Sequence, residues 1–339
     1  MIFMIHTLSM LLSIKDEEVF HLFSIYGHDI QKFDYIKAAI EKINQNLKQN
    51  DSAYRINWLK YKCKGNWKIS VKVDLVKMLD KGIIIEQDYE LVENHIRDFL
   101  LMHFGDDSSY DTLIRIDYKM DCLVPDERER ELLFHLFEKY TRKYRFKQKI
   151  KWGKDDDGNP IKYDTSQYHK NESIEFIFYS KEDERIAKGE VIKDYERHVV
   201  RYEKRLKNPH LNAMKRRDKG RNRPKKLWCY FKEDLWKEYM EKHILPIVHK
   251  GDHYKIFEAE KVISKSTFSR NKKEKLRKFL ISISKGSIDT PKKDMSPPTY
   301  RQYLKDLEKL KINPILIPKN FSTENHKSFP SYLKNPFKI

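Results

Sequence analysis

The chain has few cysteines and no long apolar run, and these absences exclude several classes of protein. Its 339 residues include only three cysteines, Cys63, Cys122 and Cys229, which are far apart and not at metal-binding spacings. We therefore expect free thiols in a reducing compartment rather than a disulfide framework or a cysteine zinc site. No stretch of 18 apolar residues occurs, so the sequence predicts no membrane span.

The apolar N-terminal stretch, residues 1–14, also lacks the features of a signal peptide. It has no basic region at its start and no small-residue cleavage site, and the acidic residues Asp16, Glu17 and Glu18 follow it at once. We therefore expect a cytoplasmic protein.

What the chain has in excess is positive charge. There are 69 lysines and arginines against 51 aspartates and glutamates, which gives a formal net charge of +18. A surplus of this size favours a polyanionic partner, most often nucleic acid. A hydrophobic content of 39% is sufficient for packed cores, and the length favours two domains over one.

Hydrophobic periodicity predicts an α+β architecture. Residues 1–57 are expected to be a helical lead-in, and residues 59–79 are expected to form two strands around a turn at Gly65-Asn66. Helices are predicted over residues 87–103 and 126–144, and a hairpin is predicted over residues 149–168 around an acidic turn. This order indicates a mainly antiparallel sheet with flanking helices, which we assign to a domain of residues 58–207.

The strand predicted over residues 111–124 carries two carboxylates on one face. Arg115, Asp117, Lys119 and Asp121 alternate with apolar residues, so all four share the polar face. Asp117 and Asp121 are four residues apart, or roughly 13 Å at the rise of a strand, which is too far for side-by-side binding of one ion. One of them could bind an ion together with a ligand from a neighbouring strand, and a solvent-facing strand is the simpler interpretation.

A second chemical pattern lies between Ser173 and Leu206. The strand predicted over residues 174–178 ends at Tyr179, Lys181 follows closely, and a later strand carries Arg201, Glu203 and Arg205 on one face. Most tyrosines at strand ends are packing residues whose hydroxyl is exposed to solvent. The pattern predicts a reactive centre only when it is combined with the carboxylates of the preceding strand.

Together these stretches resemble the replication initiation factors of rolling-circle plasmids, the family often called Rep_trans. The resemblance rests on Arg115 to Asp121, on Ser173 to Arg185 and on Arg201 to Leu206, in the order that the family has, and it covers residues 111–207. It implies that Tyr179 is the nucleophile that nicks DNA and that Asp117, Asp121 and Glu203 bind a divalent metal. It also implies double- and single-stranded origin DNA as partners and a host helicase, and it leaves a homodimer open.

The chemistry of nicking agrees with these residue types. A covalent phosphotyrosine conserves the energy of the cut bond, so that rejoining requires no ATP. Carboxylates are suitable ligands for Mg²⁺ or Mn²⁺, and Lys181 and Arg201 are candidates for phosphate contacts. The sequence contains no histidine-hydrophobic-histidine motif, which would mark the other large class of tyrosine nickases. We therefore expect carboxylates to bind the metal.

Residues 208–339 are expected to be a basic linker followed by a helical, winged-helix-like DNA-binding domain. Eleven lysines and arginines lie between residues 204 and 226, and we expect Lys215, Arg216, Arg217, Arg221 and Arg223 to contact DNA phosphates, with a solubilising linker as the alternative. The helix predicted from Thr299 to Lys311 leaves Arg301 and Lys305 outward and is the candidate recognition helix.

Two alternative hypotheses about function remain beside that of a nickase. A DNA-binding regulator without chemistry would bind an origin but would not cut it. A tyrosine recombinase would need its nucleophile near the C-terminus on a helix, whereas Tyr179 is in mid-chain on a strand. A zinc site at His249 and His253 is disfavoured because Gly251 interrupts a helix between them. The origin sequence and the type of mobile element are not readable from these residues.

Overall fold

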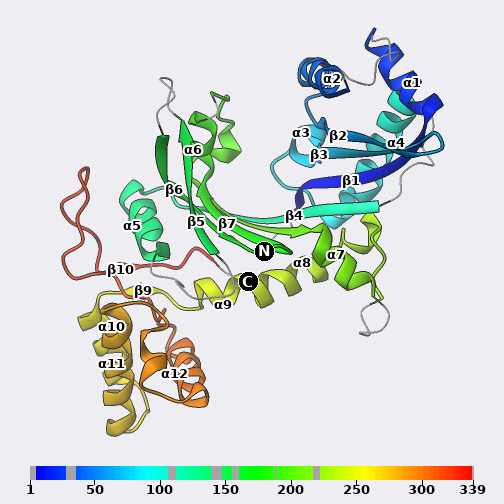
Figure 1. Cartoon of the computed structure of the whole chain (residues 1–339). Helices are drawn as coiled ribbons and strands as arrows, with labels where there is room; N and C mark the ends of the chain where they lie inside the picture. The colour runs from blue at the N-terminus through cyan, green and yellow to red at the C-terminus, as the bar shows by residue number, and fades with distance from the viewer. Residues whose placement is uncertain are drawn as a thin grey trace.

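An antiparallel sheet of eight strands forms the centre of the protein. The computed structural model describes residues 5–27, 36–105, 112–138, 147–154, 160–187, 189–216 and 222–337. The strand order is β2-β3-β1-β4-β8-β7-β6-β5, and every neighbouring pair is antiparallel (Figure 1). The strands are β1 (Ile5–Lys15), β2 (Tyr54–Cys63), β3 (Asn66–Asp74), β4 (Thr112–Leu123), β5 (Lys147–Lys154), β6 (Pro160–Lys170), β7 (Ile174–Ser180) and β8 (Val199–Lys207). The α+β class with an antiparallel sheet is thus confirmed.

Helices flank this sheet and make up most of the C-terminal part of the chain. The helices associated with the sheet are α1 (Asp16–Ile25), α2 (Ile36–Asn50), α3 (Leu75–Leu79), α4 (Tyr89–Phe104), α5 (Glu127–Glu138), α6 (Lys181–Ile186), α7 (Asn208–Lys215) and α8 (Glu233–Tyr239). Beyond them lie α9 (Leu245–Val248), α10 (Ile256–Lys265), α11 (Arg270–Ser284) and α12 (Pro297–Lys309). A small second sheet pairs β9 (His253–Tyr254) with β10 (Tyr332–Leu333). No helix in these described ranges is both long and apolar enough to cross a membrane.

The expectation of a helical lead-in over residues 1–57 is wrong for the first strand. β1 runs between β3 and β4 inside the sheet, and the expected domain boundary at residue 58 falls within β2. The reason is physical: a short, nearly continuous apolar run such as this one suits a buried strand, but its periodicity does not distinguish a strand from a buried helix. The helices α1 and α2 do follow within the expected helical range, but residues 54–57 belong to β2.

Most of the other predicted elements are present. A turn at Lys64 and Gly65, one residue before the predicted position, joins β2 to β3. The elements α4, β4, α5, the β5–β6 hairpin, β7 and β8 appear where they were expected. The later part of the helix predicted to residue 144, and the acidic turn over residues 155–159, lie outside the described residues.

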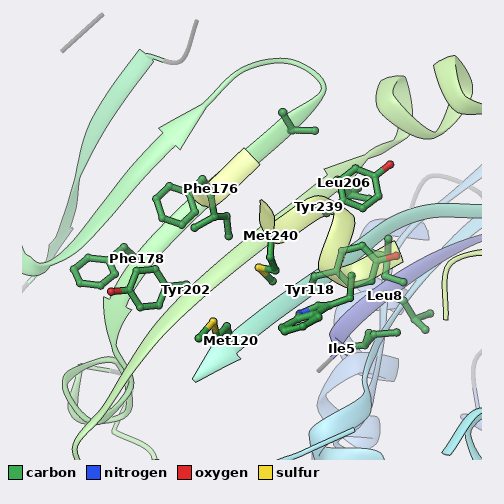
Figure 2. Close-up of a cluster of buried hydrophobic side chains, with 14 of the residues drawn as sticks. Ile5, Leu8, Tyr118, Met120, Phe176, Phe178, Tyr202, Leu206, Tyr239 and Met240 are labelled. Carbon is green, nitrogen blue, oxygen red and sulfur yellow. The ribbon is translucent and has the colours of Figure 1, made fainter. Parts of the chain in front are cut away.

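One face of the sheet is apolar and packs against the segment that follows β8. Tyr118 and Met120 of β4, Tyr202 of β8, and Tyr239 and Met240 of the covering segment meet in one cluster (Figure 2). The indole N–H of the buried Trp236 on α8 donates a hydrogen bond of 3.0 Å to the backbone oxygen of Lys119. Because side chains alternate along each strand, this packing leaves the polar residues of β4, β7 and β8 on the opposite face.

Candidate active site

Strand register brings the predicted site residues together on the polar face of the sheet. On β4 and β8, Asp117 lies opposite Arg205 and Asp121 lies opposite Arg201. On β7, Tyr179 also lies opposite Arg201. Tyrosine, carboxylates and arginines from three strands therefore occupy one polar surface, as the alternation predicted.

Tyr179 is held within this surface by two polar contacts. Its hydroxyl donates to Glu203 Oε2 at 3.3 Å, and Arg201 Nη1 donates to the hydroxyl oxygen at 3.5 Å. The side chain is 6% exposed, and burial raises the pKa of its phenol well above the ordinary value, an effect that Arg201 opposes. The hydroxyl of Tyr179 is thus protonated at neutral pH and directed at Glu203.

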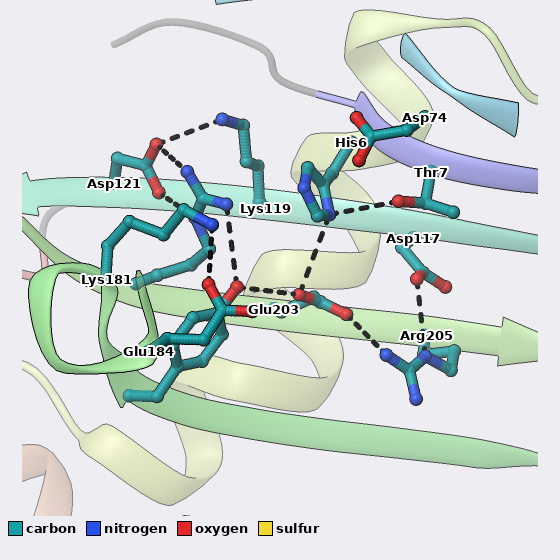
Figure 3. Close-up of polar contacts among 12 residues, drawn as sticks. His6, Thr7, Asp74, Asp117, Lys119, Asp121, Lys181, Glu184, Glu203 and Arg205 are labelled. Atoms are coloured by element: carbon teal, nitrogen blue, oxygen red, sulfur yellow. Dashed lines mark hydrogen bonds and ion pairs between the residues drawn. The ribbon is translucent and has the colours of Figure 1, made fainter. Parts of the chain in front are cut away.

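Three donors next to this hydroxyl form a group that fits a divalent metal ion. Within the described ranges, ligand atoms of His6, Asp117 and Glu203 all lie within 4.8 Å of one another. His6 Nδ1 is 3.9 Å from Glu203 Oε2 and 3.1 Å from the hydroxyl oxygen of Thr7 (Figure 3). Two carboxylates and one imidazole are a common donor set for such ions. No motif in the sequence indicated His6 as a ligand.

A β-bulge explains how His6 reaches this face. In the pairing of β1 with β4, Ile5 lies opposite Tyr118, whereas Thr7 lies opposite Asp117, so β1 has one extra residue at position 6. A bulge of this kind redirects a side chain, and bulges are frequent beside active sites. The strand was not predicted from the sequence, and a bulge within it could not be either.

Electrostatics distinguish the three donors. Burial, aided by Arg201 and Lys119, lowers the pKa of His6 well below its ordinary value, so the ring is neutral and able to bind a metal. Although burial opposes it, the charges of Arg205 and Arg115 hold the pKa of Asp117 below its ordinary value.

Glu203 behaves in the opposite way. Burial raises its pKa, and the nearby charge of Asp117 adds to this effect, whereas Arg205 opposes it. Two carboxylates this close and this buried repel each other, and a divalent cation between them would relieve the repulsion. Arg205 partly does so already, because its Nη2 donates to Glu203 at 2.9 Å and its Nε to Asp117 at 3.3 Å.

Asp121 is not brought into this group, contrary to the expectation that it is a metal ligand. Both of its carboxylate oxygens accept hydrogen bonds from Arg201, at 2.6 and 2.8 Å, and one also accepts from Lys119 Nζ at 3.1 Å. The four-residue spacing from Asp117 is the reason, because the strand separates the two carboxylates along its length. Asp121 instead orients Arg201, which contacts Tyr179.

Arg201 and Lys181 are more buried than the expected phosphate contacts would be. Arg201 is 2% exposed and is bound to Asp121. Lys181 is 3% exposed, and its Nζ donates to Glu184 at 2.5 Å and lies 3.6 Å from Glu196. Lys181 nevertheless lines the cleft described below, whereas Arg201 contacts the hydroxyl of Tyr179.

The site opens into a cleft of about 670 Å³. His6, Asp117, Tyr179 and Glu203 line its floor. Eight cationic side chains line it, namely Lys48, Arg55, Lys72, Lys77, Arg115, Lys181, Arg185 and Arg205. Besides Asp117 and Glu203, four further carboxylates line it too, those of Glu41, Asp74, Glu184 and Glu190. The lining therefore has a small excess of positive charge around the metal-binding group, which suits a phosphate backbone.

The residues predicted to bind DNA lie in two other places. Lys215 and Arg216 are exposed beside the end of α7, and Arg223 is half-buried with its guanidinium 5.7 Å from the ring centre of Tyr230. Arg217 and Arg221 lie outside the described residues. On α12, Arg301 and Lys305 are exposed, as predicted.

The two histidines considered for zinc are internal to the C-terminal part. His253 Nδ1 lies 2.8 Å from the backbone oxygen of Ile315, to which it donates. Neither His249 nor His253 belongs to the group of metal-compatible donors found in the described part of the chain.

Comparison with known proteins adds little to this picture. No protein-family model matches the chain, and no curated protein matches it in sequence. Among solved structures, the chain is similar to a rolling circle replication initiator protein from Geobacillus stearothermophilus, with 12% sequence identity and a TM-score of 0.31. The match covers 93% of this chain and 99% of the other. A likeness at this TM-score carries no argument, so the functional conclusion depends on the site.

Proposed function

We propose that the protein is a metal-dependent tyrosine nickase and strand transferase that initiates rolling-circle replication, with Tyr179 as the nucleophile. The observation that supports this most strongly is the contact of 3.3 Å between the Tyr179 hydroxyl and Glu203. Glu203 is also a member of the three-donor group with His6 and Asp117. A potential nucleophile therefore lies directly beside a potential metal site, in a cleft whose lining has a small excess of positive charge.

Each residue has a distinct part in this chemistry. His6, Asp117 and Glu203 would hold the ion, which when bound polarises the scissile phosphate and offsets its developing charge. Because the group includes an imidazole, it favours a transition ion such as Mn²⁺ over Mg²⁺. Arg201 and Glu203 hold the Tyr179 hydroxyl from two sides, which fixes its direction for attack.

The reaction exchanges one phosphate ester for another. The Tyr179 oxygen forms a bond to phosphorus as the phenol loses its proton, the bond to the deoxyribose oxygen breaks, and the released hydroxyl of the DNA takes up a proton. The phosphotyrosine conserves the ester, so that the same hydroxyl can attack it later and rejoin the strand. In this proposal the more exposed cations of the cleft contact the neighbouring phosphates, and Lys181 would do so only by leaving its carboxylate partner Glu184.

The remaining predictions extend this proposal beyond the site. A cytoplasmic protein that acts on a replication origin would use the exposed face of α12 for duplex recognition and the segment around Lys215 and Arg216 for phosphate contacts. In the competing hypothesis of a regulator without chemistry, the same surfaces would bind DNA and Tyr179 would be only a packing residue.

The proposal is tested by trapping the covalent intermediate. The wild-type protein and the variants Tyr179→Phe and Tyr332→Phe are incubated with Mn²⁺ and supercoiled DNA that carries the gene and its flanks, and adducts are separated by denaturing electrophoresis. Tyr332 is an exposed tyrosine on β10 and serves as the matched control. We expect adducts from the wild type and from Tyr332→Phe, none from Tyr179→Phe, and none in EDTA.

Loss of the Tyr179 hydroxyl removes only two long hydrogen bonds, so the variant should fold. An adduct formed by Tyr179→Phe would refute the assignment of the nucleophile. DNA binding by the wild type without any adduct would favour the regulator.

A further inference from the structure

A second groove adjoins the proposed active-site cleft. It has a volume of about 560 Å³ and lies between α2 and the edge strand β2. Glu41, Asn44 and Arg55 line both this groove and the cleft that contains Tyr179. The two hollows are therefore neighbours, and the Asn44 side chain, which is hydrogen-bonded to the backbone N–H and oxygen of Ile56 at 2.8 Å each, lies at their border.

Two aromatic residues of β2 line this groove from its two sides: Trp58 is paired with Ser70 on one face of the sheet, and Tyr61 is paired with Trp67 on the other. Trp58 is half-buried, and Tyr61 is 54% exposed. The ring of Tyr61 is braced by Trp67 of β3, with the two ring centres 5.1 Å apart in an edge-on arrangement. The ring of Tyr61 is thus held in place and still accessible, and the partly exposed ring of Trp58 flanks the other side of the groove.

The charges of the groove complement a polyanion. Three cations, Lys37, Arg55 and Lys60, line it together with one carboxylate, that of Glu41. Lys60 Nζ lies 5.5 Å from the ring centre of Trp58, so a cation and an aromatic surface occur together. Aromatic rings combined with lysine and arginine are typical of surfaces that bind single-stranded nucleic acid.

We infer that this groove binds the unpaired nucleotides that flank the nick, with bases stacked on Trp58 and Tyr61 and phosphates at Lys37, Arg55 and Lys60. The inference rests on the proposed function for the position of the nick. Single-stranded DNA is favoured over a duplex because only unpaired bases expose a face for stacking. It is favoured over a peptide because the lining has an excess of positive charge.

Binding to two labelled oligonucleotides tests this inference without any need for catalysis. The first probe is a fluorescein-labelled 15-mer of deoxythymidylate, and the second has the same phosphates but abasic sugars. The full-length protein should bind the first probe more tightly than the second, because stacking contributes roughly 1–3 kcal/mol per base.

The variants then locate the stacking. Trp58→Ala with Tyr61→Ala should weaken binding of the thymidylate probe by roughly tenfold to a hundredfold, with little effect on the abasic probe. Trp58→Phe retains a ring and should restore most of the preference. Trp228→Ala removes a tryptophan that is 55% exposed outside both hollows and should bind as the wild type does.

Two results would overturn the inference. One is equal binding of both probes by the wild type, and the other is an unchanged preference in the double variant. The nickase proposal can fail separately, because a wild type that shows the preference but forms no covalent adduct still supports the groove. The double variant should also form the adduct at a normal rate on a saturating oligonucleotide, since neither ring touches the reacting atoms.

Discussion

Replacing Asp121 with asparagine should destabilise the fold and leave metal binding intact. The carboxylate accepts two hydrogen bonds from Arg201 and one from Lys119, and both cationic side chains are almost entirely buried. Asparagine has nearly the same shape but no charge, so the two cations would remain buried without their anion.

The size of the effect follows from this burial. Removal of one partner of a buried ion pair costs about 3–5 kcal/mol. The Asp121 side chain is 18% exposed and asparagine keeps one acceptor, so we expect the lower end, about 3 kcal/mol in the free energy of unfolding. Replacement of both partners, Asp121→Leu with Arg201→Met, should cost less than the sum of the two single changes.

The assay measures stability and metal affinity on the same samples. Urea denaturation gives the free energy of unfolding, and the electron paramagnetic resonance of free Mn²⁺ gives the affinity in the absence of DNA. Asp121→Asn should bind Mn²⁺ within about twofold of the wild type, whereas Asp117→Asn should bind it at least tenfold more weakly. Equal weakening in both variants would show that Asp121 is a ligand and would refute the reasoning.

Two further predictions concern the C-terminal part of the chain. Burial lowers the pKa of His253 to about 4, whereas the unfolded value is about 6.5. Between these pH values the unfolded state binds more protons than the folded state, so the free energy of unfolding falls as the pH falls. His253→Asn keeps an amide donor for the backbone oxygen of Ile315 and should reduce the pH dependence of the free energy of unfolding by about 1.4 kcal/mol per pH unit. Urea denaturation at pH 5 and pH 6 measures this slope, and an unchanged slope would show that His253 is not the group that titrates. Arg301→Ala with Lys305→Ala should abolish the preference for the cognate duplex origin, measured against a non-cognate duplex at fixed salt, while cleavage of a single-stranded oligonucleotide persists. Equal losses on both substrates would show that α12 does not confer duplex specificity.

Alternation along strands made much of the site predictable. The period of two placed Asp117 and Glu203 on the same polar face, and both do lie there with Tyr179. The same period also placed Asp121 on that face, yet a period does not tell which carboxylate meets an ion and which meets an arginine. That choice depends on cross-strand register, which only the folded sheet defines.

His6 could not be predicted for a different reason. Its position depends on a strand whose apolar composition is ambiguous, on the insertion of that strand beside β4, and on an extra residue in the pairing. Each of these is a tertiary property without a local signal. The groove at Trp58 is similar, because it needs α2 to lie against β2.

The order of strands in the sheet has a consequence for when the protein becomes active. His6 belongs to the first strand of the chain, whereas Glu203 belongs to the last strand of the large sheet, and β4 joins the two. Contacts so distant in sequence form late, because the loop between them must first be closed. A nascent or partly folded chain would therefore have its tyrosine but not its donor group, and DNA cutting would be restricted to molecules that have completed the sheet.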